Sequence, residues 1–121
     1  MLADMSIALA AAQTLIYKAA ARAGNGFPDK QEAAQAKVFA SETAVRVTSD
    51  ALQIFGAMGY SRNLALERKM RDARMFPIAG GTAQILRTQI AGEILGMRTP
   101  QTRDGYLKLA AEDQAPARKR G

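Results

Sequence analysis

The chain has 121 residues, 48% of them hydrophobic and 23% charged, with a net charge of +6, which suits one folded domain and excludes a disordered or multidomain protein. The absence of cysteine and histidine excludes disulfide scaffolds, thiol and imidazole nucleophiles, and zinc-finger ligand sets. Charges interrupt every apolar segment well before the roughly 20 residues of a membrane helix, and the start lacks a signal-peptide pattern, so we expect a soluble, cytoplasmic protein.

The first predicted helix begins at Leu2. Its apolar residues recur every three or four positions, which is the period of a helix with one buried stripe. The stripe consists of Met5, Leu9, Ala12, Ile16, Ala19 and Ala23. Gly24 and Gly26 end this helix, and Pro28 makes its continuation unfavourable.

The second predicted helix is the longest and runs almost to Gly59. Asp29 is a suitable N-cap, and Glu32 lies three residues later, as in a capping box. The alanine-rich stripe allows neighbouring helices to approach closely. A second apolar row predicts neighbours on more than one side, so this helix is expected to be the central one. That row is Val38, Val45 and Leu52, and the main stripe is Ala33, Ala36, Ala40, Ala44, Val47, Ala51, Ile54 and Met58.

Two shorter helices are predicted to complete the fold. Asn63 is the expected cap of the third helix, and Pro77 ends it. Thr82 is the expected cap of the fourth, whose apolar points are Leu86, Ile90, Ile94 and Met97. Together the four helices predict an all-α protein, an antiparallel up-and-down four-helix bundle over residues 1–97.

Residues 98–121 are predicted to form a basic, mobile tail with at most a short helix from Tyr106 to Ala111. This tail carries half of the net positive charge. Its charge raises nucleic-acid binding as one interpretation. A charged tail is more often simply solvated, so we expect neither a nucleic-acid partner nor a membrane partner.

Two glycine-containing segments are the candidate ligand sites. Gly80 and Gly81 before Thr82 can expose backbone N–H groups at a helix start, where an anion such as phosphate is favoured, or they can simply permit a tight turn. Residues 53–60 combine an amide side chain with small residues, which can admit a ligand or another helix. No paired carboxylates or other catalytic set is evident, and no metal site is expected.

Five short segments occur along the chain in the following order: LADM (2–5), AAQAKVFAS (33–41), VTSDALQIFGAMGY (47–60), ERKMRDA (67–73) and GTAQI (81–85). Their order and spacing resemble those of the C-terminal helical domain of acyl-CoA dehydrogenases, over roughly residues 1–97. The resemblance implies a homo-oligomeric flavoprotein in which FAD lies between this domain, a middle β-domain and a neighbouring subunit.

The resemblance also implies which residues contact FAD. Gln53, Gly56 and Gly59 match the segment that contacts the adenine and diphosphate of the neighbouring subunit's flavin. Thr82 and Gln84 match positions that approach FAD at the start of the last helix. These five residues are the candidate cofactor-binding residues.

Two departures from the family pattern affect the expected activity. Gly80 replaces the glutamate that removes the α-proton of the acyl thioester in many relatives, although some relatives supply this base from an earlier helix. Ala57 stands where a second glycine is usual. The family's N-terminal helical domain and middle β-domain are missing from this sequence. We therefore expect α,β-dehydrogenation of an acyl-CoA only in a full-length parent, and weak FAD binding by this chain alone.

Two further expectations concern partners. The apolar helix faces predict homo-oligomerisation, and a noncatalytic module for self-association or protein interaction is the alternative function. A separate chain carrying the missing domains is a second possible partner.

Overall fold

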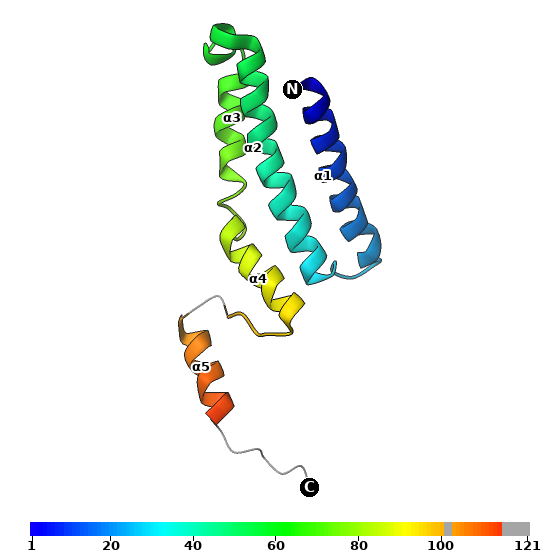
Figure 1. Ribbon diagram of the computed structural model, residues 1–121, viewed down its shortest axis with the longest axis vertical. Helices are drawn as coiled ribbons and strands as arrows, with labels where there is room; N and C mark the ends of the chain where they lie inside the picture. Colours follow the sequence, from blue (N-terminus) through cyan, green and yellow to red (C-terminus); the bar gives the residue numbers. More distant parts are fainter. Residues whose placement is uncertain (101–102, 115–121) are drawn as a thin grey trace.

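The computed structural model describes residues 1–100 and 103–114, and this part of the chain is helical without strands (Figure 1). The five helices are α1 (Leu2–Ala23), α2 (Lys30–Tyr60), α3 (Leu66–Met75), α4 (Ala83–Leu95) and α5 (Arg103–Gln114). The predicted all-α class is confirmed. No helix in the described ranges is long and apolar enough to cross a membrane.

The long helix α2 organises the other helices, as its two apolar rows predict. Helix α1 runs antiparallel along one side of α2, and α3 followed by α4 runs antiparallel along the other side (Figure 1). Among the described helices, α1, α3 and α4 each pack against α2 and not against one another. The first four helices therefore form an open layer in which α2 lies between α1 on one side and the successive helices α3 and α4 on the other.

The core is made almost entirely of small side chains. Its buried hydrophobic residues are Ala8, Ala12, Ala19, Ala34, Ala36, Val38, Ala73 and Ala83. Within the described ranges no large side chain is completely buried. Alanine at these positions lets α1 and α2 approach closely, but it buries little apolar area per residue.

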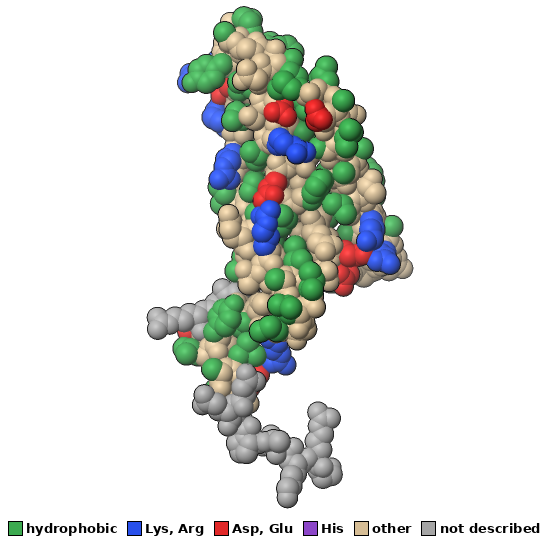
Figure 2. Space-filling model, in the orientation of Figure 1, with side chains coloured by type: hydrophobic (Ala, Val, Ile, Leu, Met, Phe, Trp, Pro, Cys, Tyr) green, Lys and Arg blue, Asp and Glu red, His purple; other side chains and the backbone are tan. Residues whose placement is uncertain are grey.

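The predicted buried stripe of α1 is only partly right. Ala12 and Ala19 are buried against α2, whereas Leu9 and Ile16 are 46% and 45% exposed. Among the described helices α1 packs only against α2, so no second helix covers these larger residues. Hydrophobic side chains are accordingly spread over the visible face of the molecule (Figure 2).

Two of the predicted caps are confirmed. The Asp29 carboxylate accepts a hydrogen bond of 2.9 Å from the Glu32 backbone N–H, and the Thr82 hydroxyl accepts one of 3.2 Å from the Ile85 N–H. The reciprocal half of the capping box is wrong, because the Glu32 carboxylate instead accepts from Lys18 and Arg22 of α1. These contacts join α1 to the start of α2.

The predicted cap at Asn63 is also wrong. Helix α3 begins at Leu66, and the Ala65 carbonyl accepts its first backbone hydrogen bond, from the Lys69 N–H at 3.0 Å. Turns occupy the residues between α2 and this point. Asn63 therefore lies in the connection, since the turn continues for two residues beyond it.

The segment after α4 folds back onto that helix. Gly96 has left-handed dihedral angles, and the Met97 N–H donates to the Gly92 carbonyl at 2.8 Å. Arg98 donates to Glu112 of α5 at 2.8 Å. The short helix predicted at residues 106–111 is thus part of a longer α5. The mobility of the tail stays a prediction, and residues 101–102 and 115–121 lie outside the described residues.

Candidate functional site

The loop between α3 and α4 is held by backbone hydrogen bonds at both ends. The N–H groups of Ile78 and Ala79 both donate to the Met75 carbonyl at 2.9 Å, and the Ala83 N–H donates to the Pro77 carbonyl at 2.8 Å. Between these anchors the chain reverses through two consecutive glycines.

Gly80 and Gly81 have φ angles of 65° and 90°, which residues other than glycine rarely adopt. Both are exposed, and a Cβ added to Gly80 would meet no atom within 4 Å. The glycine pair therefore does permit a tight turn. The same turn leaves the backbone before α4 accessible from outside the chain, so the two interpretations of this segment are compatible.

A lysine from α2 also holds this loop. The Lys37 ammonium donates to the Gly81 carbonyl at 2.6 Å, across 44 residues of sequence. Thr82 and Gln84, on the other side of Gly81, are both exposed. Sequence reasoning missed Lys37, although it lies within the AAQAKVFAS segment, because no local pattern indicates a partner so distant in sequence.

The second group of candidates lies at the end of α2. Gly56, one of the glycines expected to end this helix, has φ 54° and ψ −136°, so α2 is kinked there and continues to Tyr60. Gln53 and Gly56 are exposed, whereas Gly59 is buried. A Cβ on Gly59 would lie 2.7 Å from the Leu52 carbonyl oxygen and 2.9 Å from the Phe55 Cβ. Gly59 therefore allows the chain to pack tightly against itself.

Within one chain the two groups are separated by α3, which has 10 residues and so a length of about 15 Å. Gln53, Gly56 and Gly59 precede this helix, and Thr82 and Gln84 follow it. The structure brings the members of each group together but does not bring the two groups into one pocket. A ligand that contacts both must be long, or two ligands must be involved.

An apolar groove lies beside the α3–α4 loop and has a volume of about 520 Å³. Its floor consists of small residues of α1 and α2, and Phe76 lies at one side. The lining residues are Ile16, Ala19, Ala20, Pro28, Ala33, Ala36, Lys37, Ala40, Ser41, Ala44 and Phe76. None of the five cofactor candidates lines it.

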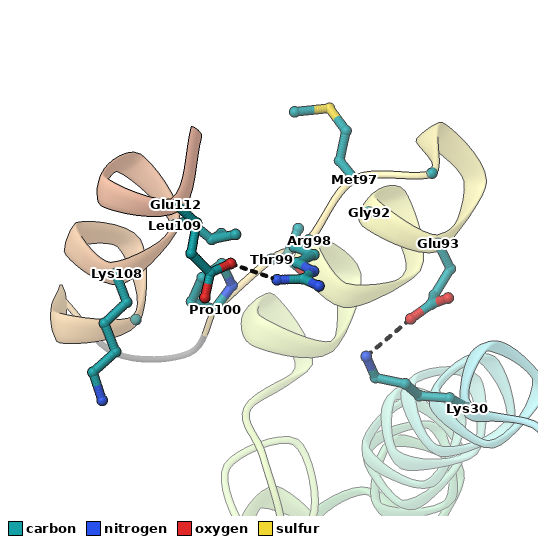
Figure 3. A pocket seen from close by; sticks show the side chains of 12 residues that line it. Lys30, Gly92, Glu93, Met97, Arg98, Thr99, Pro100, Lys108, Leu109 and Glu112 are labelled. Atoms are coloured by element: carbon teal, nitrogen blue, oxygen red, sulfur yellow. Dashed lines mark hydrogen bonds and ion pairs between the residues drawn. The ribbon is translucent and has the colours of Figure 1, made fainter. Parts of the chain in front are cut away.

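A second cavity, of about 560 Å³, lies between the end of α4 and α5 (Figure 3). Two ion pairs line it: Lys30 with Glu93 at 2.9 Å, and Arg98 with Glu112 at 2.8 Å. Figure 3 shows Lys108 pointing away from both pairs. The charges that face this cavity are thus largely neutralised by one another.

The carboxylates with shifted pKa values are all paired with cations. Hydrogen bonds from Lys18 and Arg22 lower the pKa of Glu32, one from Arg87 lowers the pKa of Glu42, and one from Arg71 lowers the pKa of Glu67. Each is therefore ionised and engaged near neutral pH, which is unlike a general base with a raised pKa.

Residues 1–95 match the family described as the C-terminal domain of acyl-CoA dehydrogenases. The chain belongs to the acyl-CoA dehydrogenase family. The predicted resemblance is therefore confirmed over α1 to α4, and members of this family are FAD flavoproteins.

Among solved acyl-CoA dehydrogenase structures, butyryl-CoA dehydrogenase from Megasphaera elsdenii superimposes with a TM-score of 0.74 and 44% identity, over 78% of this chain and 24% of that one. A glutaryl-CoA dehydrogenase in complex with glutaryl-CoA gives a TM-score of 0.73 and 35% identity, over 81% of this chain and 25% of that one.

Curated relatives differ in how similar they are. A 3-sulfinopropanoyl-CoA desulfinase of Advenella mimigardefordensis is 64% identical over 110 residues, which are 91% of this chain and 27% of that protein. The mitochondrial short-chain specific acyl-CoA dehydrogenase of Bos taurus is 46% identical over 94 residues, 78% of this chain and 23% of that protein. The chain thus spans about a quarter of the length of these relatives.

The match to the desulfinase extends beyond the family domain. The match covers 110 of the 121 residues, so it includes residues 12–110 wherever it begins. It therefore includes the first two turns of α5. The family match ends at residue 95, the last residue of α4. The segment from Gly96 to Ala110 is therefore a feature that this chain shares with a desulfinase beyond the domain common to the family.

The exposed candidate residues fit a cofactor that approaches from outside this chain. Gln53, Gly56, Thr82 and Gln84 are all exposed, and there is open space above Gly56. Gly59 differs because it is enclosed by its own segment. This arrangement is compatible with FAD bound against the surface of this chain.

Proposed function

We propose that this chain forms one side of an FAD-binding site in an enzyme that acts on an acyl-CoA thioester. The observation that carries the proposal is the exposed, doubly tethered loop at Gly80 and Gly81, which presents Thr82 and Gln84 at the start of α4. The chain contributes cofactor contacts and no catalytic side chain of its own.

The five candidate residues have different roles in this proposal. Thr82 and Gln84 contact FAD from the α3–α4 loop, and Gln53 and Gly56 contact the flavin of a neighbouring subunit. Gly59 supports that segment by allowing its tight packing against Leu52 and Phe55. When bound, FAD supplies the capacity to accept a hydride from a substrate. The cytoplasm is the proposed location.

We further propose that the parent enzyme removes a sulfinate group from a thioester such as 3-sulfinopropanoyl-CoA. Four desulfinases share 62–64% identity with this chain, against 46% for the short-chain dehydrogenase. In such a reaction the C–S bond breaks. Water supplies the hydrogen of the new C–H bond and the hydroxyl that converts the leaving SO2 group to sulfite. The acyl chain undergoes no net oxidation. Gly80, which has no side chain to remove a proton, suits this chemistry.

Dehydrogenation by the parent is the second candidate, since some family members supply the base from an earlier helix. A chimera distinguishes the two reactions. Residues 1–110 of this chain replace the corresponding C-terminal quarter of the Advenella desulfinase, and the bovine short-chain dehydrogenase segment serves as the matched control. We expect the chimera with this chain to retain FAD and release sulfite from 3-sulfinopropanoyl-CoA. A folded chimera that retains FAD but releases no sulfite would contradict desulfination.

Homo-oligomerisation is part of the same proposal. Large apolar side chains of α1 are exposed in the single chain, namely Leu2, Ile7, Leu9, Ile16 and Tyr17. An exposed apolar surface of this kind is typical of an interface or of a domain removed from its neighbours. We expect the isolated chain to self-associate at micromolar concentration in light scattering, and a monodisperse monomer would contradict this expectation.

A further inference from the structure

Lys37 connects α2 to the loop that precedes α4. Its side chain is half-buried and lines the apolar groove together with Ala33, Ala40 and Phe76. Its ammonium donates to the Gly81 carbonyl at 2.6 Å. The aliphatic part of the side chain therefore covers apolar surface while the charged end reaches the loop, as is usual for partly buried lysines.

The Gly81 peptide is the part of this loop that most needs a tether. Glycine adopts positive and negative φ angles with similar ease, so two consecutive glycines make the backbone permissive at this point. The backbone hydrogen bonds of the loop fix Ile78, Ala79 and Ala83, on either side of the glycines. Lys37 adds a hydrogen bond directly to the peptide between Gly81 and Thr82.

Helix electrostatics alone does not explain the position of this ammonium. The start of a helix carries a partial positive charge, so a cation placed there is normally unfavourable. Here the ammonium lies at the residue before the Thr82 cap of α4. The hydrogen bond to the Gly81 carbonyl offsets this repulsion, which indicates a specific contact.

We propose that Lys37 is a positioning residue of the α3–α4 loop. By holding the Gly81 carbonyl it fixes the peptide that leads into Thr82, so that the Thr82 hydroxyl caps α4 and Gln84 stays exposed. The importance of this loop for FAD rests on the proposed function, but the positioning itself rests on the contact between Lys37 and Gly81 in this chain.

Amide exchange and NMR of the 121-residue chain test the proposal. Lys37→Met keeps the aliphatic stem and removes the ammonium, and Lys37→Arg restores a donor. Lys30→Met is the matched control, because it removes a lysine from the same helix whose partner is Glu93. Losing a hydrogen bond from a charged group predicts exchange roughly tenfold faster at the N–H groups of Ala83, Ile85 and Leu86 in Lys37→Met, with most of the protection regained in Lys37→Arg.

The Gly81 carbonyl carbon reports the contact itself. Its NMR resonance is expected to move upfield in Lys37→Met and to stay unchanged in Lys30→Met. Unchanged exchange and an unchanged Gly81 resonance in Lys37→Met would overturn the proposal, as would equally faster exchange in all helices. In the desulfinase chimera, a mobilised loop with full FAD content would instead contradict the proposed function and leave the positioning role intact.

Discussion

Arg87 of α4 donates two hydrogen bonds to Glu42 of α2, and both are 2.7 Å long. The two residues are 45 positions apart, so this bidentate pair fixes the rotation of α4 against the long helix. Their side chains are 52% and 45% exposed, and solvent screening therefore keeps the contribution of the pair small.

Arg87→Lys should lower the urea midpoint of the chain slightly, because lysine cannot make two parallel hydrogen bonds to one carboxylate. Arg68→Lys on α3 is the control and should leave the midpoint unchanged. The decrease for Arg87→Lys should shrink further at high salt. Equal midpoints for Arg87→Lys and Arg68→Lys would show that the Glu42 pair does not help to hold α4.

At and below neutral pH, the stability of the chain should change only in the acidic range. Cation partners lower the pKa values of Glu32, Glu42 and Glu67 in the folded state, so these groups stabilise the fold above their unfolded pKa of about 4.3. That stabilisation is lost as the pH falls through the lower, folded pKa values. Since the chain has no histidine, the free energy of unfolding should be nearly constant between about pH 5.5 and 7.

Thermal melting across this pH range checks that expectation. Glu42→Gln should flatten part of the acidic decline, because one of the shifted carboxylates is removed. A distinct stability transition between about pH 6 and 7 would be inconsistent with the assigned ion pairs.

Gly59→Ala should destabilise the fold by about 1–3 kcal/mol, the usual cost of forcing an extra methyl group into a packed position. The added Cβ would lie 2.7 Å from the Leu52 carbonyl oxygen. Gly26→Ala is the matched control, since its Cβ would lie 3.5 Å from the Ala23 oxygen, and its effect should stay within about 0.5 kcal/mol. Urea unfolding measures both variants, and similar values for the two would refute tight packing at Gly59.

Gly92→Ala should release the segment that follows α4. The new Cβ would lie 2.5 Å from the Thr99 Cγ2 and 2.9 Å from the Met97 carbonyl oxygen, so residues 97–99 must move. We expect faster trypsin cleavage after Arg98. Adding Thr99→Ala should restore part of the protection, because it removes the nearest clashing atom. Unaltered cleavage in Gly92→Ala would mean that this segment is not docked on α4.

Local features of the sequence predict much of this fold. The caps at Asp29 and Thr82 depend on residues three positions apart, and the alanine stripe of α2 depends on helical periodicity alone. The exposure of Leu9 and Ile16 could not be predicted in this way. Periodicity identifies the apolar face of α1 but does not tell which neighbours are present to cover it.

In the candidate site, too, local sequence predicts the turn but not the contacts between residues far apart in the chain. The glycine pair at 80 and 81 indicates a turn because glycine tolerates positive φ, and the structure has that turn. The Lys37 contact joins residues 44 positions apart and leaves no local signal. The sequence also resembles an enzyme family at Gln53, Thr82 and Gln84, and the helix predicted between Asn63 and Pro77 already separates Gln53 from the other two.

The ratio of flavin to protein in the purified chain tests the central claim most directly. The chain has exposed candidate cofactor residues on both sides of α3, and none of the five candidates lines either cavity described above. Visible absorbance should therefore show little or no flavin bound to the chain alone, and near-stoichiometric flavin bound to the desulfinase chimera. Near-stoichiometric flavin retained by the isolated chain would contradict the account that this domain supplies only one side of the site.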